Sequence, residues 1–201
     1  MDNNKNYQND SSFFGYVNIA GNIELCGDAI LEWFQTEPHA QFRLIVDNEL
    51  HNEFSTFSTI QDIYPGIITI AWVANPWRRL VNIFEIMQTL HQTNQKLNIT
   101  KNINFENFTF ESFLKQLDAD VDQWFLLSTP QSRWLDNSNE LLHVVRDEFI
   151  EEDMKTIQDY FQSNRLVNLT LLPYREYYTE ETKKFVEDLF KEDIERFNFK
   201  Y

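Results

Sequence analysis

The segment that decides the fold is AWVANPWRRLVNIF, residues 71–84. An apolar run from Ile67 to Val73 predicts a buried strand, and apolar residues at helical spacing begin just after it. Between them stand Asn75, a good helix N-cap, and Pro76. Proline suits the first helical position because its φ is fixed and it has no N–H to lose. The segment therefore predicts a strand, a tight turn and a helix.

Two arginines, Arg78 and Arg79, lie in the first turn of this expected helix. Cations at a helix N-terminus oppose the helix dipole, and they are best tolerated where an anion is bound. A solvent-exposed helix surface is the other environment in which both side chains are acceptable. The local pattern leaves open whether these arginines bind an anion or simply face water.

Segments typical of strands and helices alternate along the rest of the chain. Their order predicts an α/β fold: a three-layer sandwich in which helices cover both faces of a mostly parallel central sheet. No repeat or linker interrupts residues 13–201, so we expect one domain there, after a polar and disordered tail at 1–12. The expected strands are 13–19, 42–46, 67–73 and 141–145, and the expected helices are 28–34, 77–91, 110–117, 154–161 and 185–197, with Thr109 capping the third helix.

The chain is strongly acidic, with 32 Asp and Glu against 17 Lys and Arg and a net charge of −15. This charge argues against nucleic acid and anionic membranes as partners, because both are bound through Lys and Arg. Cys26 is the single cysteine, and no spacing of His, Cys and carboxylates suggests a metal site, so we expect no metal. The polar N-terminus and the lack of a long apolar stretch lead us to expect a cytoplasmic protein.

Four segments, in one order from residue 67 to the C-terminus, resemble the motifs of PAPS-dependent sulfotransferases of the carbohydrate and membrane-associated type. The first is similar to the strand–turn–helix that binds the 3′-phosphate of the cofactor. The resemblance implies a P-loop-like sulfotransferase fold, and transfer of a sulfuryl group from PAPS to a hydroxyl of a sugar or small metabolite. The segments are 67–82, Pro130-Gln131 within 124–134, 144–161 and 177–201.

The resemblance also assigns cofactor-binding positions in this chain. Arg79 and Asn82 take two of the positions that hold the 3′-phosphate, and an Asn amide can donate to phosphate as a hydroxyl does. Gly21 and Asn22 lie in the loop after the first expected strand, where the phosphosulfate is expected to rest. Arg146, with Glu148, is expected to have a structural role, tying a strand end to neighbouring helices.

A base must also deprotonate the acceptor hydroxyl, and His51 is the first candidate. It follows the second expected strand, near where relatives place the catalytic base, and an imidazole has a suitable pKa. Glu49 and Glu53 are the alternatives in the same segment.

The chain departs from the family at the positions that contact the cofactor. Ala74 replaces an arginine and Asn82 replaces a serine of the 3′-phosphate site. The candidate phosphosulfate loop has no lysine, and Glu24 brings a negative charge to it. Two functions therefore follow: a sulfotransferase whose degenerate loop weakens or abolishes transfer, or a catalytically inactive sulfotransferase-fold protein that binds a ligand or partner.

Overall fold

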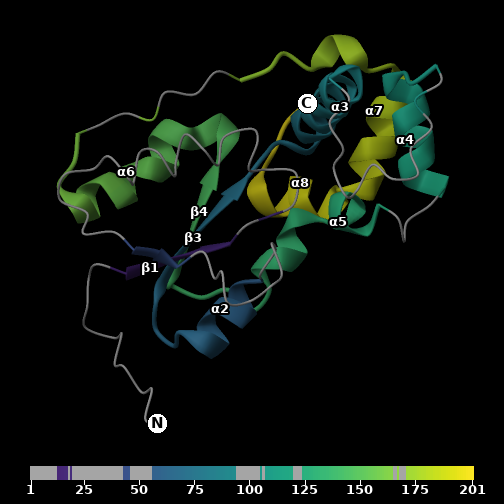
Figure 1. The fold of residues 1–201 in the computed structure, drawn as a ribbon. Coiled ribbons are helices and arrows are strands. Elements are labelled where there is room, and N and C mark those ends of the chain that lie inside the picture. The colour runs from purple at the N-terminus through teal and green to yellow at the C-terminus, as the bar shows by residue number, and fades with distance from the viewer. Residues whose placement is uncertain are drawn as a thin grey trace. The chain divides into compact units, whose positions relative to one another are not determined.

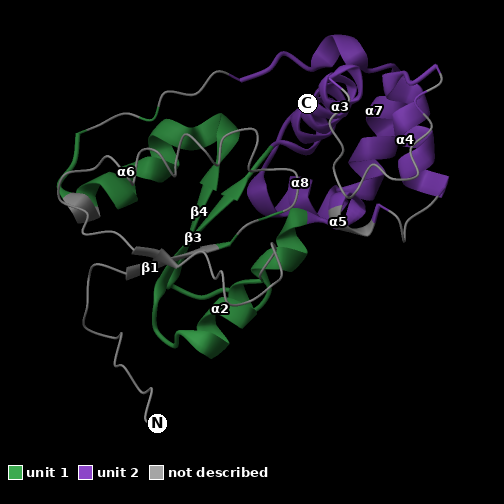
Figure 2. Cartoon of the chain, viewed as in Figure 1, with its two compact units in different colours: residues 1–74, 131–170 green, residues 75–130, 171–201 purple. Residues whose placement is uncertain are grey.

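A computed structural model describes the chain at 13–17, 19, 43–45, 56–93, 105, 107–119, 124–164, 167 and 171–201. Gly21, Asn22, Glu24 and His51 lie outside these residues, as does the N-terminal segment 1–12. The chain divides into two compact units, each built from two pieces of sequence (Figure 2). We call residues 1–74 with 131–170 the sheet unit, and residues 75–130 with 171–201 the helical unit.

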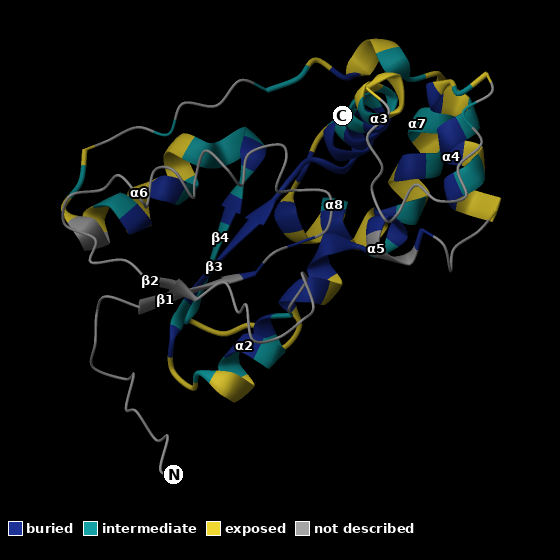
Figure 3. Ribbon diagram, viewed as in Figure 1, coloured by how far each residue is buried: buried dark blue, intermediate teal, exposed yellow. Residues whose placement is uncertain are grey.

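The sheet unit contains a parallel sheet with the strand order β2-β1-β3-β4, of which β1, β3 and β4 are labelled in Figure 1. Strand β1 pairs in parallel with β2 and with β3, and β3 pairs in parallel with β4. The prediction of an interior strand is confirmed, because β3 lies between two neighbours and is buried from Thr69 to Val73 (Figure 3). The strands are β1 (Phe13–Val17), β2 (Arg43–Ile45), β3 (Ile68–Val73) and β4 (Leu142–Arg146).

Helices pack on this sheet within the same unit. Helix α2 contacts β1, and helix α6 contacts β4. The N-cap of α2 is Thr56, whose hydroxyl accepts a hydrogen bond from the Thr59 N–H. The mixed α/β class is therefore confirmed, while the three-layer arrangement stays a prediction. The helices of the unit are α2 (Phe57–Ile63), η4 (Gln131–Leu135), η5 (Asp147–Phe149) and α6 (Ile150–Phe161).

The helical unit is built around α3, which contacts α4 and α7, while α7 contacts α8. Its interior is rich in aromatic rings: Phe84 lies 5.4 Å from Phe110 and 6.1 Å from Phe113 between ring centroids, and Phe113 lies 5.7 Å from Trp124. Phenylalanines thus provide much of this core. The helices are α3 (Pro76–Gln92), α4 (Phe110–Ala119), α5 (Phe125–Ser128), η6 (Arg175–Tyr177), α7 (Glu180–Leu189) and α8 (Lys191–Phe197).

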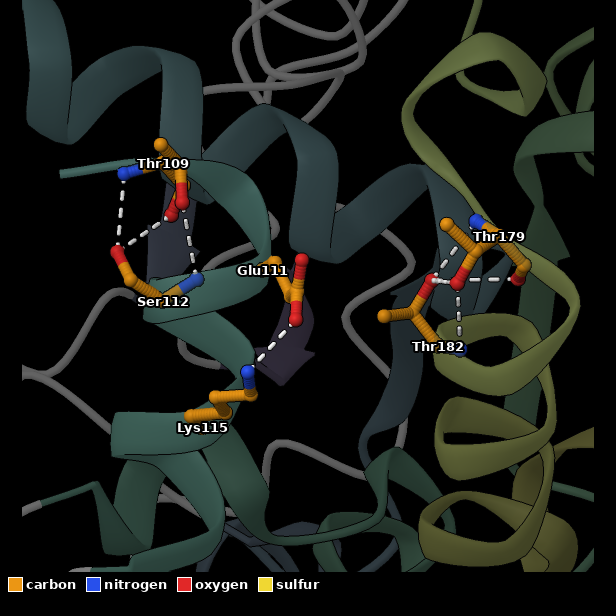
Figure 4. A network of polar contacts seen from close by, with 6 residues as sticks. All are labelled: Thr109, Glu111, Ser112, Lys115, Thr179 and Thr182. Carbon is orange, nitrogen blue, oxygen red and sulfur yellow. Dashed lines mark hydrogen bonds and ion pairs between the residues drawn. The ribbon is translucent and has the colours of Figure 1, made fainter.

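Two helices of this unit begin with a reciprocal pair of hydroxyl residues (Figure 4). At α4 the Thr109 hydroxyl accepts from the Ser112 N–H, and the Thr109 N–H donates to the Ser112 hydroxyl. Thr179 and Thr182 form the same arrangement at α7. Each pair satisfies backbone donors that a helix N-terminus leaves unbonded. The expected N-cap at Thr109 is confirmed.

Candidate functional site

The connection between β3 and α3 is the place where the sequence predicts an anion site. Asn75 is the N-cap of α3, and its Oδ1 accepts from the Trp77 N–H at 3.1 Å. Its Nδ2 donates to the Lys200 carbonyl at 2.9 Å, and its own carbonyl accepts from the Arg79 N–H at 2.9 Å. The predicted roles of Asn75 and Pro76 are confirmed. Acceptors within the chain thus occupy two N–H groups of the first turn, those of Trp77 and Arg79.

The residue that follows β3, Ala74, is held by a side-chain amide. The Ala74 N–H donates to Gln131 Oε1 at 2.9 Å, and Gln131 Nε2 donates to the Ala74 carbonyl at 2.7 Å. Gln131 is fully buried, so both backbone groups are satisfied without water. The motif comparison singled out Pro130-Gln131 but not this role. Polar residues flank Gln131 in the sequence, so no local pattern marks it as a buried side chain.

Arg79, the predicted 3′-phosphate ligand, is fully buried inside the helical unit. Its Nη1 donates to the Leu127 carbonyl at 3.1 Å, and its guanidinium carbon lies 5.7 Å from the centroid of the Phe190 ring. Burial lowers the pKa of Arg79 to about 10, and attraction to the Asp193 carboxylate opposes that shift. Asp193, at the start of α8, is itself fully buried. The arginine therefore lies among groups from two other segments of its own unit, α5 and the start of α8.

The neighbouring arginine is buried as well. Arg78 is 8% exposed, and its guanidinium carbon lies 5.0 Å from the centroid of the Tyr174 ring. Neither arginine therefore faces solvent, which excludes the interpretation that both lie on a solvent-exposed helix surface. Asn82, the other predicted ligand of the 3′-phosphate, is half-buried on α3.

In the sheet unit, Arg146 binds Asp153 at the end of β4. Its Nε and Nη2 donate to the two carboxylate oxygens at 2.7 and 2.6 Å, and its backbone N–H donates to Oδ2 at 2.9 Å. The hydrogen bonds to this carboxylate raise the pKa of Arg146. Because Asp153 belongs to α6, Arg146 ties the end of β4 to a neighbouring helix, as expected.

Three other predicted site residues, Gly21, Asn22 and His51, lie outside the described residues. Among the residues with described positions, no group of three His, Cys, Asp or Glu side chains is arranged to hold a metal ion. No helix among them is both long enough and apolar enough to cross a membrane. Comparisons of the chain with protein families, characterised proteins and solved structures find no match.

Proposed function

We propose that this chain is a sulfotransferase-like protein that binds a ligand or partner and does not transfer a sulfuryl group from PAPS. The observation that carries the proposal is the full burial of Arg79 against the Leu127 carbonyl, Phe190 and Asp193. A guanidinium bound in this way is unsuited to a 3′-phosphate. Turning it toward a nucleotide would move the guanidinium away from the buried Asp193 carboxylate that attracts it, which is costly.

The β3–α3 connection supports the same proposal. A phosphate bound at a helix N-terminus needs backbone N–H groups that point at it. Here the N–H groups of Ala74 and Trp77 each donate within the chain. Ala74 also lacks the side chain that an arginine would contribute at this position. The segment therefore offers an anion little of what the corresponding segment offers in the family.

The family part of the proposal is supported by the order of the strands and by the sequence motifs. The sheet order reverses between β1 and β3, since β2 lies on one side of β1 and β3 on the other. Open parallel sheets bind ligands beyond the carboxyl ends of their strands at such a reversal. We infer a three-layer sulfotransferase fold, in which the ligand of this protein binds beyond the carboxyl ends of β1 and β3.

Isothermal titration of the full chain with PAP, the product that remains after transfer, tests this function. We expect no binding in the micromolar range and no sulfated product when PAPS is supplied with sugar hydroxyl acceptors. In parallel, PAP at a hundred times its Kd would stabilise the fold by about 2.7 kcal/mol, so a melting curve gives a second measurement. Micromolar PAP binding with transfer to a hydroxyl would overturn the proposal.

A matched pair of variants separates loss of the loop from loss of the helix site. Gly21→Lys with Glu24→Ser restores the cation and removes the carboxylate of the candidate phosphosulfate loop. If only the loop is degenerate, this variant gains PAP binding. If Arg79 is held near Asp193 as proposed, this variant still does not bind PAP. Binding then appears only when Ala74→Arg is added. Asn82→Ala is the control. Because we expect the wild type not to bind PAP, this change should leave PAP binding as it is.

A further inference from the structure

Three aromatic side chains of the helical unit surround the ring of Tyr201. The ring centroids of Trp77, Tyr174 and Tyr178 lie 5.4, 5.8 and 5.9 Å from that of Tyr201, with interplanar angles of 77°, 84° and 88°. These are edge-to-face contacts, in which the positive edge of one ring meets the negative face of another. We call Trp77, Tyr174 and Tyr178 the aromatic box.

Cationic side chains gather at the aromatic box although the chain is acidic overall. Lys183 Nζ lies 4.2 Å from the centroid of the Tyr201 ring, and the guanidinium carbon of Arg175 lies 5.8 Å from it. Arg78 approaches the Tyr174 ring to 5.0 Å. Glu180 is the acidic neighbour, 4.0 Å from Lys183 between charged atoms. The Tyr201 ring, which occupies the box, therefore contacts two cations, Lys183 and Arg175.

The walls of the box are held by bonds that do not involve the Tyr201 ring. Trp77 Nε1 donates to the Lys183 carbonyl at 3.2 Å, and the Tyr178 hydroxyl donates to the Trp77 carbonyl at 2.9 Å. Trp77 and Tyr174 are buried, whereas Tyr201 is half-buried. The Tyr201 hydroxyl makes one observed hydrogen bond, to the Arg175 carbonyl at 3.1 Å. The box thus has preformed walls, and solvent reaches its occupant.

We propose that the aromatic box is a binding site for a planar aromatic anion, and that Tyr201 occupies it when no ligand is bound. A ligand ring would replace the Tyr201 ring in the edge-to-face contacts. Its negative group would pair with Lys183 and Arg175, an attraction that neutral Tyr201 cannot provide. This inference does not depend on the proposed function, because it involves neither Arg79 nor the backbone N–H groups of the β3–α3 connection.

The test is isothermal titration of the full chain with phenyl phosphate, a small planar aromatic anion. When an internal side chain occupies a site, the apparent Kd equals the intrinsic Kd divided by the fraction of time that the site is open. Removing that side chain should therefore strengthen binding. We expect Tyr201→Ala to bind phenyl phosphate about tenfold more tightly than the wild type, as a site open about a tenth of the time requires. Tyr201→Phe, which keeps the ring, is the matched control and should bind as weakly as the wild type.

Two comparisons distinguish this site from a cavity made by truncation. In the Tyr201→Ala background, benzyl alcohol and inorganic phosphate should each bind far more weakly than phenyl phosphate, and Lys183→Gln should reduce the affinity for phenyl phosphate. Equal binding of benzyl alcohol and phenyl phosphate would overturn the proposal, as would unchanged affinity in a folded Tyr201→Ala protein.

A measurement on the unmutated sequence covers the case in which Tyr201→Ala does not fold. With 3-fluorotyrosine incorporated, the fluorine resonance of Tyr201, assigned by its absence in Tyr201→Phe, should shift on addition of phenyl phosphate. It should not shift with benzyl alcohol at the same concentration. An unmoved Tyr201 resonance at saturating phenyl phosphate contradicts displacement of the ring.

Discussion

Each unit of the chain brings an arginine close to an aspartate, and the two pairs differ in their access to solvent. In the helical unit, Arg79 and Asp193 are both fully buried. In the sheet unit, the side chains of Arg146 and Asp153 are 22% and 11% exposed. The pKa of Arg79 falls to about 10 because burial outweighs the attraction of Asp193. The pKa of Arg146 rises because its hydrogen bonds to Asp153 outweigh burial.

The contrast shows that a motif match does not fix what an arginine does. Both arginines lie in segments that resemble sulfotransferase motifs, and the family role expected for Arg79 was to bind a phosphate. Its surroundings instead resemble a protein core with one charge pair inside it. Arg146 keeps partial contact with water and makes a bidentate bond, the geometry in which guanidinium and carboxylate interact most strongly. Burial, rather than residue type, separates the two environments.

The largest expected effect is that of Asp193→Asn. This change removes the carboxylate charge that attracts the buried Arg79 guanidinium, and breaking a buried charge pair in this way costs about 3–5 kcal/mol. The free energy of unfolding, measured by urea denaturation and circular dichroism, should fall by that amount. Arg79→Met with Asp193→Leu is the matched control, because an apolar pair avoids the uncompensated charge and should restore much of the loss. A single-variant loss below about 1 kcal/mol, as for an exposed pair, would contradict the buried pair.

The next effect concerns Gln131, which is as buried as Arg79 but uncharged. Gln131→Met keeps a similar volume and leaves the N–H and carbonyl of Ala74 without their partners. Because each unsatisfied buried group costs about 1–3 kcal/mol, we expect a loss of about 2 kcal/mol or somewhat more in the same assay. Gln88→Met is the control, since its amide makes a 3.4 Å contact with the Phe108 carbonyl in a partly buried place, and its effect should stay within about 0.5 kcal/mol. Equal losses in the two variants would contradict the role of Gln131.

The parts of the fold predicted from sequence depend on neighbouring residues. Asn75 and Pro76 mark the start of α3, and Thr109 marks the start of α4, because a helix cap bonds to residues two or three positions away. The continuous apolar run predicted β3 as an interior strand because a strand covered on both faces needs apolar residues on both. Such signals are complete within one segment of sequence.

The contacts of the candidate site could not be predicted in this way. Gln131 binds Ala74 across 57 residues, and Asp193 is still farther from Arg79 in the sequence. Nothing in the segment around Arg79 indicates whether its partner is a ligand phosphate or a carboxylate of the chain. The resemblance favoured a ligand phosphate because it assigns the family's role to any matching arginine. The environment of Arg79 depends instead on a second residue, Asp193, which α8 supplies.

A smaller effect is expected for Asp153→Asn in the sheet unit. The amide keeps one acceptor for Arg146 but loses the charge, and because this pair is partly exposed we expect a loss of about 1–2 kcal/mol. Salt screens exposed charges more than buried ones, so this loss should shrink at high salt while that of Asp193→Asn changes little. Urea denaturation at low and high salt measures both. Equal salt dependence of the two variants would remove the distinction that burial makes.

The smallest effect concerns a third polar pair, closer to solvent than either arginine pair. The Tyr177 hydroxyl donates to Glu85 Oε1 at 2.8 Å, and this bond is the main reason that the pKa of Tyr177 rises to about 12 from its usual 10.0. A raised tyrosine pKa favours the folded state below pH 10, and the benefit is lost as the pH rises from 10 to about 12. The phenolate absorbance of the wild type minus that of Tyr177→Phe should therefore titrate near 12. In Glu85→Gln, which keeps the acceptor without its charge, the same difference should titrate closer to 10, with little change in stability at neutral pH. A wild-type difference that already titrates at 10 would mean that Glu85 does not hold the Tyr177 proton in solution, and that even this pair is weaker than its geometry indicates.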